Sequence, residues 1–594
     1  MSTTHSAPAK GSPLLLVLFA VALAPTFLVG YAVGAGSASV VGGFVAMYSL
    51  IAFLGGPLRA DLRLAAALSP LLLFAAIVPR LLGEVSRPAA IAVLVVIVFV
   101  AALLPLRGPR FVTVGLGLGM VALFAYGMAL IGPAGPWQVV VAAVTGVVIA
   151  VVLRVLLGLP DPSKATREKI ADVLVADVPA TAAAFDTWLA DGRRRWLGIA
   201  LGAASRYRLA LHAAEAVQRA EQVDDALDAL RARARDIAER LRAKRPGAAQ
   251  PVENSPAVPA FAAEAAAALD AVERAVDQRD TSRVPSADRH HRLRDAVLRP
   301  SVRLRSIQVR HAVRTAFGLL LILVITAHLP AGDPLVATAL LTTFGILQAS
   351  WRETLTKARP RVLGLIGGAA LTAVSILVAP AAYLPVVALA ALVVALWNMM
   401  ARPALAYTFM VVVTVGFNTS LRHTDPVRTL VEYAALTLVA VLIGVLVGFA
   451  VVPGLRPEPL QRRIVAARAK TAAALRAMTG SATSPETLAL HRAAAQARAE
   501  LTPDREQLDD DQLAELDRFR AALRDFSTLA ATAALDPDSD PDRLNAALDA
   551  LDDRAAPAPT DGEVPASILA GLAEQVRATE AQLLATLPHP GGRS

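Results

Sequence analysis

The chain has 594 residues, of which 55% are hydrophobic and 18% are charged, and its mean hydropathy is +0.53. This composition excludes an ordinary soluble protein of this size and indicates a polytopic membrane protein. The formal net charge is +9, and the basic residues lie beside apolar segments and in long charged blocks. We therefore interpret this charge as a signal of membrane topology and not of nucleic-acid binding.

Residues 1–159 form an apolar block. A membrane-spanning helix needs about 20 mainly apolar residues, because unpaired backbone groups cannot be left in hydrocarbon. On this rule the block contains six predicted spans, at 13–35, 38–56, 64–82, 88–106, 111–132 and 137–158. The alternative for the first is a signal peptide preceded by Lys10. Its apolar run is long for a signal, and removing it would break the match with the second apolar block.

Residues 160–303 form a charged block rich in Ala, Arg, Asp, Glu and Leu, a composition that favours helix. Apolar residues spaced alternately by four and three form a helix-packing seam. The seam residues are Val223, Leu227, Leu230, Ala234, Ile237 and Leu241. We predict a bundle of amphipathic helices, interrupted by a loop at 246–260.

Residues 304–455 repeat the apolar pattern, and residues 456–594 repeat the charged one. Six further spans are predicted, at 311–329, 334–350, 362–380, 383–401, 403–420 and 431–453. The second charged region has its own seam, formed by Leu516, Phe519, Leu523, Phe526 and Ala530. We expect both seams to close their own bundles, with a dimeric coiled coil as the alternative. A loop is predicted at 555–565.

The predicted fold is therefore all-α: a polytopic membrane protein with two six-helix transmembrane repeats, each followed by a cytoplasmic helical bundle. Each block crosses the membrane an even number of times, so the repeats are predicted to be parallel. Orientation follows from Lys and Arg in short loops. One side carries Arg59, Arg63, Arg107, Arg110, Arg352, Lys357, Arg359, Arg361 and Arg402, and the other carries Arg80, Arg87, Arg422 and Arg428. This asymmetry predicts a cell-membrane protein with both termini in the cytoplasm.

Glycines four residues apart recur inside the spans, where they place small residues on one helix face and allow close packing. The glycines predicted to pack helices in this way are Gly115, Gly119, Gly364, Gly368, Gly444 and Gly448.

Polar residues within spans are costly, and they concentrate in the second apolar block. In the first block, Arg154 is interpreted as a snorkelling side chain. The candidates for a substrate path are Arg314, Thr342, Thr343, Asn398, Tyr407 and Asn418. The candidates for proton coupling are His328, Asp333 and Glu432. The alternative for each is an interfacial residue or an interhelical hydrogen bond.

Several kinds of chemistry have no signature in this sequence. The absence of cysteine excludes disulfides and thiolate metal sites. No phosphate-binding G-x-x-x-x-G-K-[ST] run occurs, which argues against an ATP-driven pump, and no H-E-x-x-H zinc motif is present. The pair His290 and His291 is interpreted as solvated linker. We expect no cofactor, no metal and no enzymatic activity.

The second apolar block resembles a known family. The resemblance rests on Arg310-His-Ala-Val-Arg314-Thr-Ala, on Leu341-Thr-Thr with Gln348, on Ala358-Arg-Pro-Arg361-Val-Leu-Gly364 with Gly367 and Gly368, and on Tyr407-Thr-Phe. These residues are similar to the fusaric acid resistance family of bacterial membrane proteins, which includes the aromatic acid exporters. The alternation of six spans with a helical region, twice, is also similar. The sequence departs from the family pattern at Gly332-Asp333-Pro334-Leu335 and at Gly364-Leu365.

The resemblance implies an inner-membrane protein that exports aromatic or other organic carboxylic acids, using the proton gradient and not ATP. Its expected partners are the lipid bilayer and a small organic anion, with homo-oligomerisation left open and no nucleic acid. Two alternatives remain. The first is a passive anion channel, like the distantly related aluminium-activated malate channels of plants. The second is a membrane-anchored scaffold whose cytoplasmic bundles bind a protein.

Overall fold

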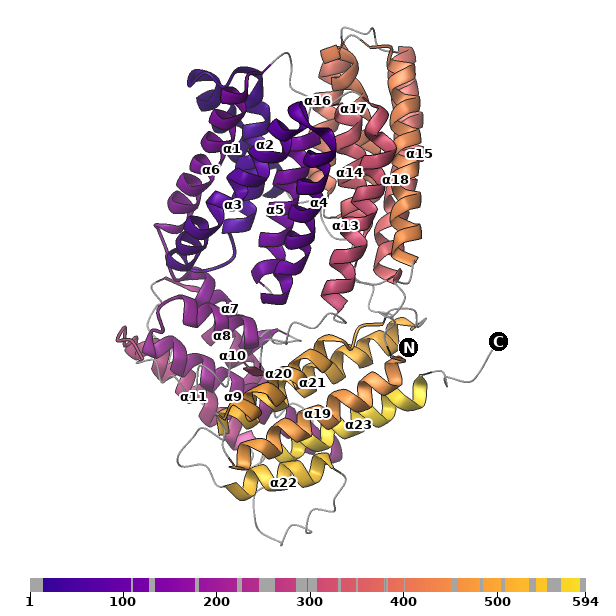
Figure 1. The fold of residues 1–594 in the computed structure, drawn as a ribbon. Helices are drawn as coiled ribbons and strands as arrows, with labels where there is room; N and C mark the ends of the chain where they lie inside the picture. Colours follow the sequence, from indigo (N-terminus) through magenta and orange to yellow (C-terminus); the bar gives the residue numbers. More distant parts are fainter. Residues whose placement is uncertain are drawn as a thin grey trace. The chain divides into compact units, whose positions relative to one another are not determined.

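The computed structural model is described here for most of the chain, and every structural statement refers to these residues. They are 14–107, 110–127, 134–176, 181–221, 227–244, 262–284, 296–297, 307–329, 333–348, 351–378, 380, 383–399, 401–422, 424–449, 458–480, 484–503, 508–533, 541–552 and 568–587. Within them the chain is helical, and the one β contact is an isolated bridge between Arg194 and Arg283 (Figure 1). The predicted all-α class is confirmed for this part of the chain.

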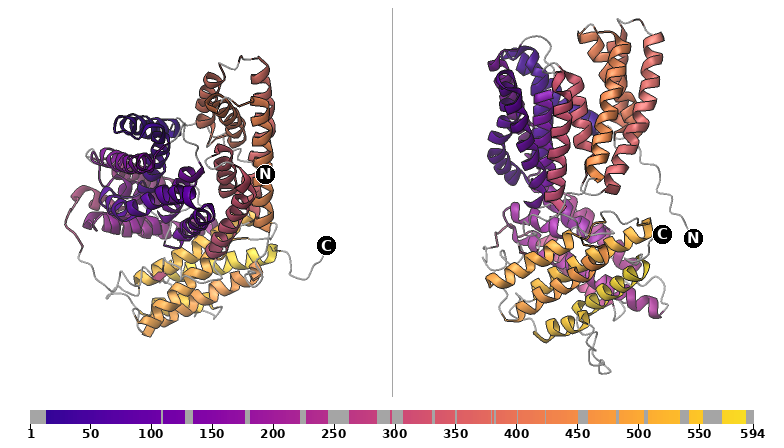
Figure 2. Two further views of the ribbon diagram at one scale, coloured as in Figure 1. Left: turned by 45° about the horizontal axis from the view of Figure 1, so that its top comes forward. Right: turned by 45° about the vertical axis from the view of Figure 1, so that its right-hand side comes forward.

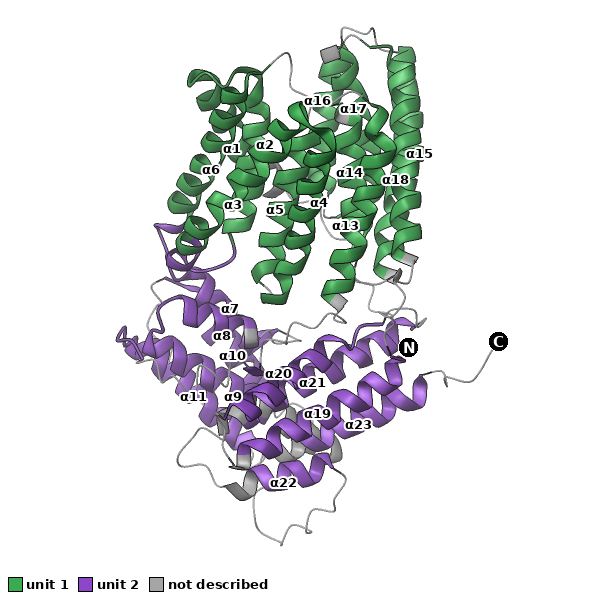
Figure 3. Ribbon diagram, in the orientation of Figure 1, with its two compact units in different colours: residues 1–54, 62–157, 304–456 green, residues 55–61, 158–303, 457–594 purple. Residues whose placement is uncertain are grey.

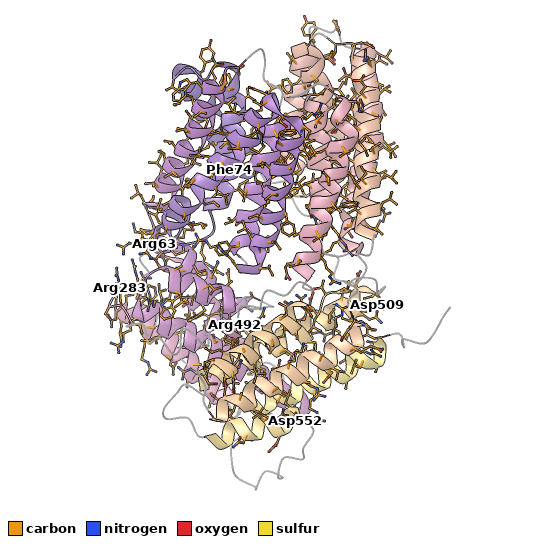
Figure 4. All side chains as sticks on the ribbon, viewed as in Figure 1. Arg63, Phe74, Arg283, Arg492, Asp509 and Asp552 are labelled. Atoms are coloured by element: carbon orange, nitrogen blue, oxygen red, sulfur yellow. The ribbon has the colours of Figure 1, made fainter. Side chains whose placement is uncertain are left out.

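Segments far apart in the sequence combine into two compact units (Figure 3). Unit 1 comprises residues 1–54, 62–157 and 304–456, and unit 2 comprises 55–61, 158–303 and 457–594. The two apolar blocks therefore form one unit, and the two charged blocks form the other. Side chains ending in nitrogen and oxygen crowd unit 2, whereas those of unit 1 are mostly hydrocarbon (Figure 4).

Each of the twelve predicted spans coincides with a helix of unit 1. The helices of the first block are α1 (Leu14–Ala32), α2 (Ser39–Phe53), α3 (Leu58–Val85), α4 (Arg87–Leu103), α5 (Arg110–Gly127) and α6 (Pro136–Gly158). Those of the second block are α13 (Ile307–Ile325), α14 (Pro334–Ile346), α15 (Trp351–Val378), α16 (Leu384–Asn398), α17 (Pro403–Arg422) and α18 (Pro426–Phe449). Short 3-10 turns are η1 (Gly36–Ala38), η2 (Leu104–Arg107) and η4 (Thr326–His328).

Nine of the described helices are long and apolar enough to cross a membrane, which indicates a multi-pass membrane protein. Shorter apolar helices are found at Phe19–Ala32, Leu335–Ile346 and Leu384–Asn398. Local chemistry explains the start of α14, where Asp333 accepts a hydrogen bond of 2.9 Å from the Leu335 amide and Pro334 occupies the first turn. This helix is shorter than the predicted span 334–350, because it ends at Ile346.

Helices from the two apolar blocks pack against each other within unit 1, and Figure 2 shows them running alongside one another. Helix α13 packs on α4, and α5 packs on α14. A Cβ on Gly127 of α5 would lie 2.7 Å from the Ala337 Cα of α14, so glycine is needed for this close approach. The Arg87 guanidinium of α4 donates at 2.9 Å to the carbonyls of Thr326 and Leu329, which joins α4 to the end of the α13 segment.

Unit 2 contains helices from both charged blocks. The first block supplies α7 (Lys164–Val175), α8 (Thr181–Ala190), α9 (Arg195–Glu221), α10 (Asp228–Arg242) and α11 (Ala263–Gln278). The second supplies α19 (Leu460–Gly480), α20 (Pro485–Ala499), α21 (Asp510–Ala533), α22 (Pro541–Leu551) and α23 (Ile568–Thr586). The described seam residues are buried in separate cores, Leu227 to Leu241 in the first set of helices and Leu516 to Ala530 in the second. Val223, the His290–His291 pair and the predicted loops at 246–260 and 555–565 lie outside the described residues.

Arginine side chains cap several helix C-termini, where the last four carbonyl groups have no partner within the helix. Each of these arginines donates to a carbonyl at the end of a helix other than its own or just beyond that end. They are Arg87, Arg167, Arg208, Arg279, Arg463, Arg468 and Arg577.

Candidate functional site

The side chain of Arg361 lies half-buried inside the helix bundle of unit 1. One guanidinium nitrogen donates to the carbonyl of Thr342 on α14, and the guanidinium carbon lies 5.0 Å from the centre of the Tyr407 ring on α17. This stacking is a cation–π contact. Within the described part of the chain, Arg361 has no carboxylate partner.

Two glycines make room for this arrangement. A Cβ on Gly345 of α14 would overlap the Arg361 guanidinium, so any side chain there would displace the arginine. A Cβ on Gly364 would lie 2.9 Å from the Ala404 carbonyl oxygen and would overlap the Tyr407 Cβ. Gly364 therefore allows α15 and α17 to approach closely enough for Tyr407 to lie beside Arg361.

Arg361 differs from the arginines that cap helix ends. Its acceptor, the Thr342 carbonyl, lies four residues before Ile346, so the helix itself already supplies a donor to that oxygen. Arg167, Arg468 and Arg577, by contrast, donate to carbonyls in the last turn of the helix that they cap, which have no partner within that helix. Helix capping therefore does not account for Arg361.

Further polar residues lie on the same face of α17 as Tyr407 and on α18. Tyr407, Thr414 and Asn418 are spaced by seven and four residues, which places them on one face of α17. Tyr433 of α18 is buried against Val411 of α17, within electrostatic range of Arg361. These side chains and Arg361 form what we call the polar seam, defined as Arg361, Tyr407, Thr414, Asn418 and Tyr433.

The substrate-path candidates from the sequence are only partly brought together. Tyr407 stacks on Arg361, and Thr342 contributes its backbone carbonyl. Asn418 belongs to the polar seam, but its amide donates to the Thr414 carbonyl at 2.7 Å, within its own helix. The Thr343 hydroxyl donates to the Ala339 carbonyl at 2.9 Å, within its own helix. Likewise, the Asn398 amide donates to the Val394 carbonyl at 2.9 Å. Arg314 is buried on α13.

The three proton-coupling candidates are all found at helix ends and not in the interior. His328 is exposed in η4, and Asp333 caps the start of α14. Glu432 is exposed and forms an ion pair of 2.8 Å with Arg428, one turn earlier in α18. None of them contacts Arg361.

All six glycines selected from the sequence lie at contacts between helices. Gly115 faces Ala101 of α4, Gly119 faces Phe344 of α14, and Gly448 faces Thr354 of α15. Gly364 and Gly368 face α17, and Gly444 faces Ile346 of α14.

The sequence analysis placed Arg361 in a short loop between spans, and the loop assignment was wrong. Helix α15 begins at Trp351, so residue 361 lies well inside a helix and not in the connection before the predicted span 362–380. The family motif includes Arg361, but the sequence does not show which residues it contacts, because Thr342 and Tyr407 come from helices before and after its own. His311, 3.5 Å from the Thr315 hydroxyl on α13, was also not selected.

The described residues hold no cluster of His, Cys, Asp and Glu fit to bind a metal ion. No family model, curated protein or solved structure matches the chain. The similarity to the fusaric acid resistance family therefore rests on the motifs quoted above.

Proposed function

We propose that this chain is a multi-pass cell-membrane transporter that exports aromatic or other organic carboxylic acids without ATP. The proposal includes a parallel repeat of two six-helix blocks, with both termini and unit 2 in the cytoplasm. It is carried by one observation, the half-buried Arg361 stacked on Tyr407 with no carboxylate beside it in the described residues.

The chemistry of this site suits a carboxylate. A guanidinium presents N–H donors in a fixed fork that matches the two oxygens of a carboxylate, and the match is strongest where water is excluded. Apolar helices surround the site and favour a substrate that carries hydrocarbon or an aromatic ring beside its charge. Both properties together describe an amphiphilic organic acid.

The outer surface of unit 1 supports the membrane location. Large apolar side chains are exposed along one face of α16, at Val386, Leu389, Val393 and Trp397, and along α18 at Val431, Leu438, Leu442 and Leu446. Their three- and four-residue spacing is that of a helix face in contact with lipid. Helix packing supports the repeat, because two contacts recur at equivalent positions in both blocks. The fourth helix packs on the fifth in each block (α4 on α5, α16 on α17), and the second packs on the sixth (α2 on α6, α14 on α18).

The direct test uses the purified full-length protein in liposomes with radiolabelled benzoate as the probe. We expect benzoate flux above that of protein-free liposomes, saturation with concentration, and acceleration by an imposed pH gradient. Absence of flux for benzoate and for a panel of other organic anions would refute the proposal.

A passive anion channel is a second candidate, favoured by one observation. Each carboxylate or imidazole proposed for proton coupling is exposed or engaged at a helix end, which leaves no interior proton relay among them. Electrical recording in planar bilayers separates the two functions, because a channel produces unitary currents and a slow carrier does not.

A further inference from the structure

Arg498 is buried in the core of unit 2 and connects two regions that are far apart in the sequence. From α20 its guanidinium donates to the Val297 carbonyl at 2.7 Å and to the Ser527 hydroxyl of α21 at 3.0 Å. The Ser527 hydroxyl in turn donates to the Leu523 carbonyl at 2.6 Å. This chain of hydrogen bonds ties Val297 to two helices of the C-terminal region.

The segment held by Arg498 comes from the first charged block. Ala296 and Val297 are 0% and 1% exposed, and they belong to the core that α19 to α23 form. Helix α13 begins soon afterwards in the sequence, at Ile307. The residues between them, 298–306, lie outside the described part of the chain. The C-terminal helices therefore enclose a piece of chain that comes shortly before α13 in the sequence.

The charge on Arg498 has no carboxylate partner among the described residues, and both of its printed acceptors are neutral. Burial, together with the nearby charge of Arg524, lowers the pKa of Arg498 to about 10, so the side chain remains charged at neutral pH. His491, seven residues earlier on the same face of α20, is also buried, and its Nε2 has no hydrogen-bond partner. A buried cation held only by neutral acceptors is costly, so its place in the core depends on these two hydrogen bonds.

We propose that Arg498 is a releasable latch that fastens the Ala296–Val297 segment into the C-terminal helices, and that its release alters the rate of transport. The first half of this proposal stands on the contacts alone. The second half rests on the proposed transport function.

The latch is tested by the reactivity of a single introduced cysteine. Labelling can be assigned to that residue, because the natural sequence contains no cysteine. Ala296→Cys in the full-length protein in detergent should react slowly with a maleimide, since residue 296 is buried. Adding Arg498→Gln should increase the labelling rate at least tenfold. Arg498→Lys, which retains a charged donor, should give an intermediate rate.

The matched control is Arg492→Gln on the same helix, because Arg492 is exposed (Figure 4). It should leave the labelling rate of Ala296→Cys unchanged. A second reporter, Ala547→Cys on α22, lies in the same core and is also 0% exposed. If Arg498→Gln leaves residue 296 protected, or if it exposes residues 296 and 547 equally, the latch is refuted.

Transport is measured separately, as benzoate flux in liposomes. Arg498→Gln should change the flux at least threefold relative to the natural protein, and Arg492→Gln should not. Faster labelling at residue 296 with unchanged flux would refute the regulatory half. No flux from the natural protein would refute the proposed function, while the labelling result would still decide the latch.

Discussion

At the scale of single residues, some arginines form ion pairs between helices, and others donate to backbone carbonyls in two different ways. Many of the latter donate to carbonyls at the C-terminus of another helix, where orphan acceptors and the helix dipole favour a cation. Arg361 instead donates to a carbonyl inside α14 and stacks on Tyr407. The two roles are indistinguishable in the sequence, because both appear there as an arginine in a helical stretch.

Replacing Arg361 tests whether it binds the transported anion. Arg361→Gln removes a charge-assisted hydrogen bond worth about 1.5–3 kcal/mol, so KM for benzoate should rise about 10- to 100-fold. Arg361→Lys should recover part of this loss, since lysine keeps the charge but not the fork. Flux in liposomes over a concentration series gives KM.

Arg359→Gln is the matched control for Arg361. It lies two residues earlier on α15 and is exposed. An equal rise in KM for both variants would mean that general surface charge, and not the site at Tyr407, governs binding.

His491 makes the stability of the C-terminal helices depend on pH. Burial, and secondarily the charge of Arg498, lowers the pKa of His491 to about 4. The unfolded state therefore binds a proton near pH 6.5 while the folded state does not, so stability is lost as the pH falls from about 6.5 to about 4. The loss should reach about 3 kcal/mol at the end of this window.

Hydrogen exchange of the α20 amides, corrected for the intrinsic rate at each pH, measures this effect. The protein carrying His491→Gln should lose less protection than the natural protein between pH 7 and pH 4.5. His328→Gln, at an exposed histidine of unit 1, should behave like the natural protein. Identical pH profiles for the natural protein and His491→Gln would contradict the prediction.

At the scale of helices, glycine contacts determine which side chains meet. The approach of α15 to α17 depends on Gly364, and this approach places Tyr407 beside Arg361. The four-residue spacing of glycines predicted close packing but not the partner helix. That choice depends on which faces are complementary in three dimensions.

Gly364→Ala tests the importance of this approach. The added Cβ would overlap Tyr407, so α15 and α17 must separate, and we expect a stability loss of about 1–3 kcal/mol together with reduced flux. Thermal denaturation of the protein in detergent and flux in liposomes measure the two effects.

Gly83→Ala on α3 is the control, because its Cβ would make only ordinary contacts, at 3.6 Å from Tyr126 and 3.7 Å from Ala90. It should be neutral or slightly stabilising, since alanine is the better helix former. Equal losses at residues 83 and 364 would show that helix propensity, and not the contact with Tyr407, is responsible.

At the scale of the whole molecule, the two apolar blocks share one unit and the two charged blocks share the other. All the contacts described for Arg361 lie within unit 1, whereas the Arg498 latch lies within unit 2. The proposed anion site and the proposed latch thus belong to separate compact bodies.

Deleting residues 457–594 tests this separation. We expect benzoate flux to persist at an altered rate, because unit 1 contains the whole polar seam but the latch is gone, and we expect Ala296→Cys to be labelled rapidly, because its covering helices are gone. Flux in liposomes and maleimide labelling measure the two results. Loss of all flux from a deletion variant that still inserts in the membrane would make unit 2 an obligatory part of the transport mechanism.

The sequence by itself determined the helical class, the positions of the twelve apolar helices and the two buried seams. These follow from hydrophobic periodicity and apolar length, which are properties of neighbouring residues. Only the tertiary structure decided that Tyr407 lies on Arg361 and that Val297 enters the C-terminal core. The reason is that a buried charge is stabilised by groups near it in space, and here those groups lie in distant parts of the chain.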